Sequence, residues 1–195
     1  MSAREEMLSG IRRLSLEEIS LPEIPDFSYQ PDLINQFKEA LQSNGAILAQ
    51  VGVNNIEGYL NDHFSKELKR LSLSEKFSGN MSLTGAISPH QLEGVDVAVV
   101  EAVFGVAENG ALWIEPSHLN IPVLPFIVSH LVILADRNRL VANMHEAYKK
   151  IHLRDQRFGL FIAGPSKTAD IEQSLVIGAH GPLSLTVLLV DAEAP

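Results

Sequence analysis

The chain has 195 residues, of which 46% are hydrophobic, 20% are charged and none is cysteine. This length suits one ordinary domain, which buries roughly 70% of the unfolded chain's surface and can therefore form a core without disulfides. The lack of cysteine excludes thiolate zinc sites, a cysteine nucleophile and an ordinary iron–sulfur cluster in this chain. A net charge of −9, with no cationic stripe among the 15 basic residues, argues against nucleic-acid binding.

No segment has the pattern of a signal peptide or of a membrane span. Residues 1–14 are polar and helix-like rather than charged and then apolar. The longest apolar stretch, residues 121–135, is interrupted by two prolines, a serine and a histidine and is too short to cross a bilayer. We therefore expect a cytoplasmic location and no membrane span.

The first elements are predicted to be a peripheral helix and an extended arm. Residues 2–14 carry apolar side chains at helical spacing. Three prolines in residues 21–32 forbid a continuous helix there. We expect residues 1–31 to form an N-terminal helix and proline-rich arm, lying on the core or on a neighbouring subunit, and residues 32–195 to form the domain.

The domain is predicted to open with a helix, a strand and a second helix. Residues 32–43 have a helical apolar pattern, and Asn44-Gly45 suits the C-terminal cap. The apolar run 46–51 predicts a buried strand. Residues 54–71 predict a helix, with apolar side chains at every fourth position from Ile56. This succession indicates an α/β fold.

Strands are predicted to dominate the second half of the chain. After a loop at residues 73–94, the apolar run 97–106 is typical of a strand covered on both faces. Asn109-Gly110 is a dipeptide favoured in hairpins and predicts a turn to a partner strand at 111–114. Further strands are expected at residues 130–135, 158–163 and 183–190, and a helix capped by Asp136 is expected to end near residue 151.

Three polar segments adjoin apolar runs and are candidates for chemistry: residues 107–110, 164–172 and 178–182. In open α/β sheets ligands bind at the carboxyl ends of strands. The second segment has the parts of an anion site, because Gly164 allows close backbone approach, Ser166 and Thr168 carry hydroxyls and Lys167 carries a positive charge. The alternative for this segment is a helix cap with a surface lysine.

Two titratable side chains in the other segments are candidates for proton transfer. His180 lies between two small residues and could act as a general acid or base, or be a hydrogen-bonded structural histidine. Glu108 ends a very apolar run, where desolvation would raise its pKa and suit it to proton transfer or nucleophilic attack; otherwise it is an exposed turn residue. Glu101 lies inside that run and predicts either a buried partner or an edge strand.

Other catalytic patterns are missing. The seven histidines include no HExxH motif, so no metal site is predicted. No GxSxG or GxGxxG motif is present, which argues against a serine hydrolase and a dinucleotide-binding fold.

Together, GPSKTADIE at residues 164–172 and GAHGP at residues 178–182 resemble the signature of the LUD family, the domain of lactate-utilisation proteins C and B. The resemblance is strongest over residues 97–191. Relatives tend to carry Ala-Glu-Thr-Gly-Thr where this chain has residues 107–111, which keep Glu108 but have neither threonine. The resemblance implies a mostly parallel sheet flanked by helices, similar to the sugar-phosphate isomerase and CoA transferase fold.

The resemblance also implies a component of a system that oxidises L-lactate to pyruvate alongside iron–sulfur partner proteins. The cofactor stays unassigned, and the ligand would be a small anionic metabolite at loops following the strands. Lys167 would hold the anion, His180 would move a proton, and Glu108 would act as a base or orient the ligand. The remaining ligand-binding candidates are Asn109, Gly110, Gly164, Ser166, Thr168, Asp170 and Gly181.

Two alternatives stay open, as does the question of whether the chain is itself an enzyme. One is a non-catalytic assembly or regulatory module, whose N-terminal arm docks onto partner subunits or a second copy. The other is acyl transfer, because Glu108-Asn109-Gly110 is similar to a stretch of class I CoA transferases in which the glutamate attacks an acyl-CoA.

Overall fold

The computed structural model describes residues 2–14, 20–23, 25, 32–82, 89–119, 121–151, 158–169 and 175–191. The helices are α1 (Ala3–Arg12), α2 (Leu33–Ser43), α3 (Ile56–His63), α4 (Leu124–Ile127) and α5 (Met144–Lys150). The strands are β1 (Ile47–Gly52), β2 (Arg70–Ser72), β3 (Val97–Glu101), β4 (Phe104–Val106), β5 (Ala111–Ile114), β6 (His130–Asp136), β7 (Leu140–Val141), β8 (Leu160–Ile162), β9 (Lys167–Ala169), β10 (Leu175–Ile177) and β11 (Ser184–Asp191).

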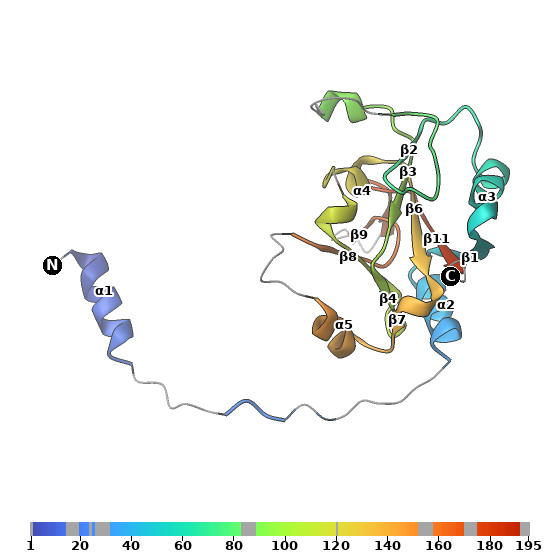
Figure 1. The fold of residues 1–195 in the computed structure, drawn as a ribbon. Coiled ribbons are helices and arrows are strands. Elements are labelled where there is room, and N and C mark those ends of the chain that lie inside the picture. Colours follow the sequence, from blue (N-terminus) through green and yellow to red (C-terminus); the bar gives the residue numbers. More distant parts are fainter. Residues whose placement is uncertain are drawn as a thin grey trace.

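A five-stranded sheet in the order β1-β11-β6-β3-β2 forms the centre of the domain, and every pair of neighbouring strands in it is parallel (Figure 1). Strands β2, β3, β6 and β11 start level with one another, since Arg70 pairs with Val97, Val97 with His130, and His130 with Ser184. Strands β6 and β11 are buried almost throughout, as expected for parallel strands that are covered on both faces.

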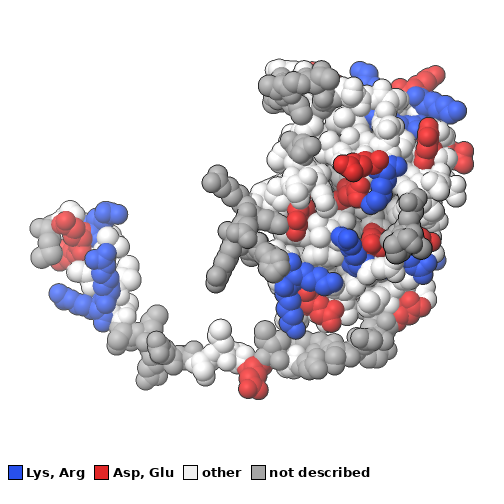
Figure 2. All heavy atoms as spheres, viewed as in Figure 1, with Lys and Arg blue, Asp and Glu red and all other residues white. Residues whose placement is uncertain are grey.

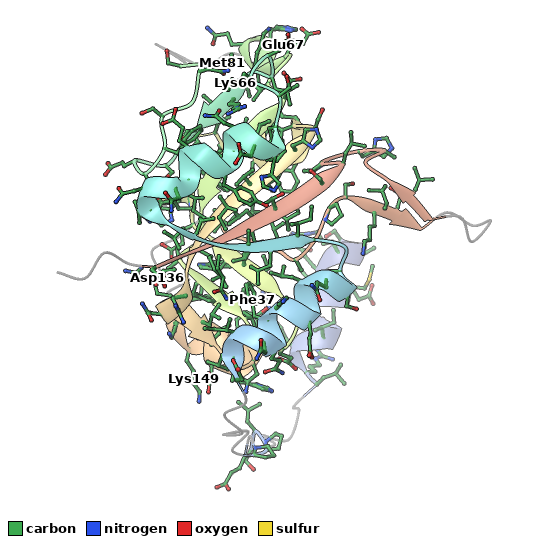
Figure 3. All side chains as sticks on the ribbon, turned by 90° about the vertical axis from the view of Figure 1, so that its right-hand side faces the viewer. Phe37, Lys66, Glu67, Met81, Asp136 and Lys149 are labelled. Carbon is green, nitrogen blue, oxygen red and sulfur yellow. The ribbon has the colours of Figure 1, made fainter. Side chains whose placement is uncertain are left out.

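Each face of this sheet packs on a different layer. Ile56 and Leu60 of α3 pack on one face, in a cluster with apolar side chains of β3, β6 and β11. Phe37 and Leu41 of α2 pack on the other face, together with side chains of a second sheet in the order β7-β4-β5-β8 (Figure 3). The prediction of a mostly parallel α/β sheet flanked by helices is therefore confirmed.

The apolar run at residues 97–106 is two strands rather than the single strand expected. β3 belongs to the central sheet and β4 to the second sheet. The chain changes partners between them, because the Ala102 N–H donates to the Leu134 carbonyl and the next N–H, of Val103, donates to the Trp113 carbonyl. Both strands are buried, so their hydrophobic pattern is the same as that of one long strand. The predicted turn at Asn109-Gly110 is confirmed by the antiparallel pairing of β4 with β5.

Two predicted helices are shorter than expected. The helix at residues 54–71 ends at His63, although Phe64 and Leu68 still pack on the α3 cluster from non-helical backbone. The helix expected to start at Asp136 starts only at Met144, because Asp136 caps the 3-10 turn Arg137–Arg139 instead. β7 follows this turn, and Asn143 then caps the separate helix α5.

The N-terminal helix α1 lies apart from the rest of the chain (Figure 1). A capping box between Ser2 and Glu5 starts this helix, and none of its residues is buried. On the face of the domain drawn in Figure 2, basic and acidic side chains alternate rather than gathering by sign. No helix in the described part of the chain is both long enough and apolar enough to cross a bilayer.

Candidate functional site

The segment that follows Gly164 is a β-hairpin strand rather than a helix cap. Lys167, Thr168 and Ala169 form β9, which pairs antiparallel with β10. Lys167 lies opposite Ile177, and the side chains of Lys167 and Thr168 are exposed. Asp170, the other candidate in this segment, lies outside the described residues.

Ser166 joins this segment to the Gly178–Pro182 loop through two backbone hydrogen bonds. The Ser166 N–H donates to the Pro182 carbonyl, and the Gly178 N–H donates to the Ser166 carbonyl, both at 2.9 Å. A methyl group at Gly181 would lie 2.9 Å from the Ser166 Cβ, so a glycine is needed for this close approach. The two motifs, separate in sequence, are therefore one structural unit.

This unit meets the central sheet at the amino end of its parallel strands. Residues 178–182 precede Ser184, the first residue of β11, and therefore lie at the amino end of the parallel strands. Residues 164–166 follow β8, which belongs to the second sheet. Each segment directly follows a strand, β8 or β10, but neither strand belongs to the central parallel sheet.

The end of α2 connects the unit to the turn at residues 107–110. The Asn44 side-chain amide donates to the Asn109 carbonyl at 2.8 Å. A methyl group at Gly164 would lie 2.7 Å from the Asn44 carbonyl oxygen, and one at Gly45 would lie 3.7 Å from the Lys167 Nζ. Asn44-Gly45, which the sequence identified only as a helix cap, thus touches both segments.

Glu108 is held at the start of α5 rather than by the unit that contains Ser166. Its side chain is exposed, which removes the desolvation expected for it, and its carboxylate accepts a hydrogen bond from the Met144 N–H at 2.9 Å. Met144 begins α5, where a negative charge is stabilised by the helix dipole. The structure therefore does not bring this carboxylate to Lys167. Asn109 and Gly110 shape the turn, since Asn109 Oδ1 accepts from the Ala111 N–H and the Gly110 N–H donates to the Val106 carbonyl.

The arrangement offers an exposed lysine, hydroxyls and an exposed histidine on a fixed backbone. His180 is exposed between Gly178 and Pro182, the two residues that bond to Ser166. Such a surface can hold a small anion and exchange a proton with it. Within the residues that the structure describes, no group of three or more histidine or acidic side chains is arranged to hold a metal ion.

Comparison with known proteins assigns the chain to a family. Residues 62–190 match the family model described as the LUD domain. The chain belongs to the LUD family. It is 30% identical over 106 residues to lactate utilization protein C of Oceanobacillus iheyensis and 32% identical over 109 residues to that of Shouchella clausii. These matches cover 51% and 53% of this chain but only 45% and 48% of the relatives, so the chain spans about half of their length.

A solved structure supports the LUD fold. A DUF162 family protein from Deinococcus radiodurans superposes with a TM-score of 0.62, covering 82% of this chain and 96% of that protein. The two sequences are 15% identical, so this likeness shows the fold alone. The expected resemblance to the LUD family and its α/β fold is confirmed.

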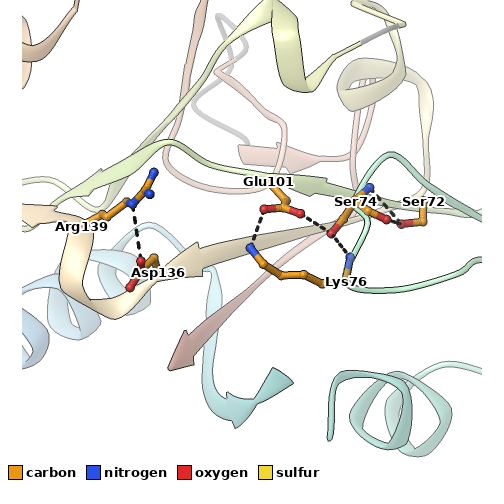
Figure 4. A network of polar contacts seen from close by, with 6 residues as sticks. All are labelled: Ser72, Ser74, Lys76, Glu101, Asp136 and Arg139. Carbon is orange, nitrogen blue, oxygen red and sulfur yellow. Dashed lines mark hydrogen bonds and ion pairs between the residues drawn. The ribbon is translucent and has the colours of Figure 1, made fainter. Parts of the chain in front are cut away.

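The carboxyl end of the LUD domain's central sheet carries a polar network around Glu101 (Figure 4). The Ser74 hydroxyl donates to Glu101 Oε1 at 2.5 Å, and the Lys76 ammonium contacts Oε2 at 2.6 Å. The partner expected for Glu101 is therefore present, and the edge-strand alternative is wrong because β3 lies between β6 and β2. Ser74 and Lys76 carry no sequence signal that would pair them with a glutamate about 25 positions away.

Burial alone would raise the pKa of Glu101, but hydrogen bonds from Lys76 and Ser74, the charge of Lys76 and that of His118 hold it below its ordinary value. A carboxyl whose pKa is lowered by folding stabilises the protein above its unfolded pKa, about 4.3 for glutamate. That stabilisation is lost as the pH falls through the lower, folded pKa.

We therefore expect Glu101→Gln to lower the free energy of unfolding by about 1–2 kcal/mol at pH 7, because a partly exposed ion pair is weakened by solvent. The difference from wild type should shrink as the pH falls below about 4. Urea denaturation at pH 7 and below about pH 4 measures this difference in the free energy of unfolding. Asp191→Asn, which breaks an exposed pair with Arg137, is the control and should cost less than about 0.5 kcal/mol. An equal loss at both pH values would contradict the assigned charge interaction.

Proposed function

We propose that this LUD domain takes part in lactate utilisation by binding a small carboxylate anion on the unit formed by residues 164–168 and 178–182. The observation that supports this most is the pair of hydrogen bonds at Ser166, which join the two motifs. Relatives that share this region are named lactate utilization protein C, so lactate and pyruvate are the first ligands to test.

In this proposal Lys167 supplies the cation that attracts the carboxylate. Ser166 and Thr168 supply hydroxyl groups, and Gly164 and Gly181 allow close backbone approach. Asp170, which lies outside the described residues, and Asn109 and Gly110 of the neighbouring turn stay predicted ligand-binding residues. His180 moves a proton on or off the ligand. Since the chain has no cysteine for an iron–sulfur cluster, electrons removed from lactate would pass to an iron–sulfur partner protein.

Glu108 has a positioning role in this proposal, because its hydrogen bond to Met144 ties the 107–110 turn to α5. We do not extend the proposal to acyl transfer through Glu108. The hydrogen bond at the start of α5 engages this carboxylate, which leaves it less available to attack an acyl group.

The substitution Lys167→Ala tests the anion site. Loss of a charged hydrogen-bond donor should raise the Kd for lactate or pyruvate about tenfold or more, equivalent to at least ~1.4 kcal/mol. Isothermal titration calorimetry at low ionic strength measures this change. The matched control is Lys150→Ala, an exposed lysine of α5, which should leave the Kd unchanged. Equal affinities of wild type and Lys167→Ala, for a ligand that binds, would show that the lysine does not hold the anion.

A second candidate function is that of an assembly module, and the exposure of α1 favours it. Met7 and Ile11 are 69% and 62% exposed and lie one turn apart on the same side of the helix, and Leu14, 69% exposed, follows just after its C-terminal end. An unpaired apolar stripe on a peripheral helix is typical of segments that dock onto another protein. A partner subunit, or a second copy of this chain, would cover it.

A further inference from the structure

A cavity of about 370 Å³ lies between α3 and the segment after β2, away from the unit described above. Its polar lining consists of Glu57, Asn61, Lys66, Arg70, Ser78 and Asn80. Figure 3 labels Lys66 at one end of the molecule, where the Asn80 side-chain amide donates to the Lys66 carbonyl. This volume is at the lower end of the range for small-molecule sites.

Arg70 is a buried cation in the wall of this cavity. It is only 4% exposed, and it starts β2 with its backbone N–H donating to Asn80 Oδ1. Its guanidinium donates from Nη1 to Asn61 Oδ1 at 2.8 Å, and from Nη2 to the backbone carbonyls of Phe64 and Ser65. All of these acceptors are neutral. The Nε atom is buried and has no hydrogen-bond partner in the described part of the chain.

The carbonyl groups that accept hydrogen bonds from Arg70 offset part of the cost of burying its charge. Phe64 and Ser65 directly follow α3, and the end of a helix carries roughly half a negative charge. The guanidinium carries a full positive charge, of which these neutral acceptors offset only a part. Burying a charge is costly unless it is paired. Because no ion pair joins Arg70 to a described carboxylate, the wall retains positive charge.

The exposed charged side chains of the cavity wall leave this excess of positive charge in place. Lys66 contributes a second positive charge, and Glu57 contributes one negative charge. Two cations therefore face one carboxylate, in a chain whose net charge is −9. Hydrogen-bond donors are also present, since Asn61 uses only its oxygen in the bond to Arg70 and Ser78 carries an exposed hydroxyl.

We propose that this cavity is a second anion site, which binds a small carboxylate or phosphate through Arg70 and Lys66. Arg70 lies level with Ser184 but three strands away in the sheet order, about 14 Å at ordinary strand spacing. The cavity is therefore distinct from the Gly178–Pro182 loop, which precedes Ser184.

Two substitutions at exposed positions test this site and leave the buried arginine in place. One removes a positive charge from the cavity wall, and the other removes a negative charge. Lys66→Ala should raise the Kd of the bound anion about threefold to tenfold, and Glu57→Gln should lower it by a similar factor. The probes are inorganic phosphate and acetate, titrated separately by calorimetry at low ionic strength. Binding of phosphate alone assigns a phosphate site, binding of acetate alone a carboxylate site, and binding of both a general anion site.

The controls separate this site from surface charge and from the proposed lactate site. Lys69→Ala removes an exposed lysine that does not line the cavity and should leave the Kd unchanged. The titrations are repeated in the Lys167→Ala background, in which the proposed lactate site is weakened, and the effects of Lys66→Ala and Glu57→Gln should persist there. No binding of either probe to the wild type would overturn the proposal. Equal weakening by Lys66→Ala and Lys69→Ala would do so too, as would an unchanged Kd in Glu57→Gln.

Discussion

Replacing Gly178 by alanine should lower the free energy of unfolding by about 2–4 kcal/mol and abolish anion binding at the Ser166 unit. Gly178 has a φ of +77°, a conformation that costs a residue with a Cβ about 1 kcal/mol or more. The added methyl group would also overlap the Leu183 side chain and lie 3.2 Å from the Leu183 Cα. Relief of this overlap would move the Gly178 N–H away from the Ser166 carbonyl.

Urea denaturation measures the stability change, and calorimetry with the bound anion measures the functional change. Gly58→Ala is the matched control, because this glycine lies inside α3 with no atom within 4 Å of an added methyl group. It should stabilise the protein by about 0.5–1 kcal/mol through helix propensity. A Gly178→Ala protein as stable as wild type would show that the loop does not need this backbone conformation.

Removal of residues 1–26 should abolish assembly while leaving the stability of the domain unchanged. None of the described residues before Asp32 is buried, so their loss opens no cavity in the core. The apolar stripe of Met7, Ile11 and Leu14 is lost with them. We expect the melting temperature to change by less than about 2 °C, since losing ~1 kcal/mol shifts it by roughly 2–4 °C in a chain of this size.

Size-exclusion chromatography with light scattering measures assembly of the chain alone and after mixing with a candidate iron–sulfur partner. The double variant Met7→Glu with Ile11→Glu keeps the arm but interrupts the stripe, so it should behave like the truncation. A truncated chain that still forms the same complex as the full chain would exclude the assembly role of the arm.

Local patterns predicted the elements that depend on nearby residues. The helix before Asn44-Gly45 and the turn at Asn109-Gly110 occur as expected, because glycine with a positive φ ends the first and closes the second. The helix expected after Asp136 begins only at Met144, since Leu140 and Val141 are buried in a strand beside β4. That pairing is non-local and leaves no mark in the helical pattern.

The distinction between local sequence patterns and contacts between distant positions also applies to the candidate site. The two LUD motifs identified Ser166, Lys167, His180 and Gly181 from sequence, but not that Ser166 bonds to both sides of the second motif. The contact of Asn44 with Asn109 and that of Glu108 with α5 depend on hydrogen bonds between a side chain and a backbone group 65 and 36 positions away. Arg70 has no distinguishing sequence context, and only its burial without a carboxylate partner marks the second cavity.

The most direct test of the proposed lactate site is to map which backbone amides respond when lactate or pyruvate is added to the isotope-labelled protein in an NMR titration. We predict that the amide signals of Ser166, Gly178 and Gly181 shift together with one binding constant, and that they stop responding in Lys167→Ala. Saturable binding that leaves these three amides unmoved would contradict the proposal that the two motifs form the anion site.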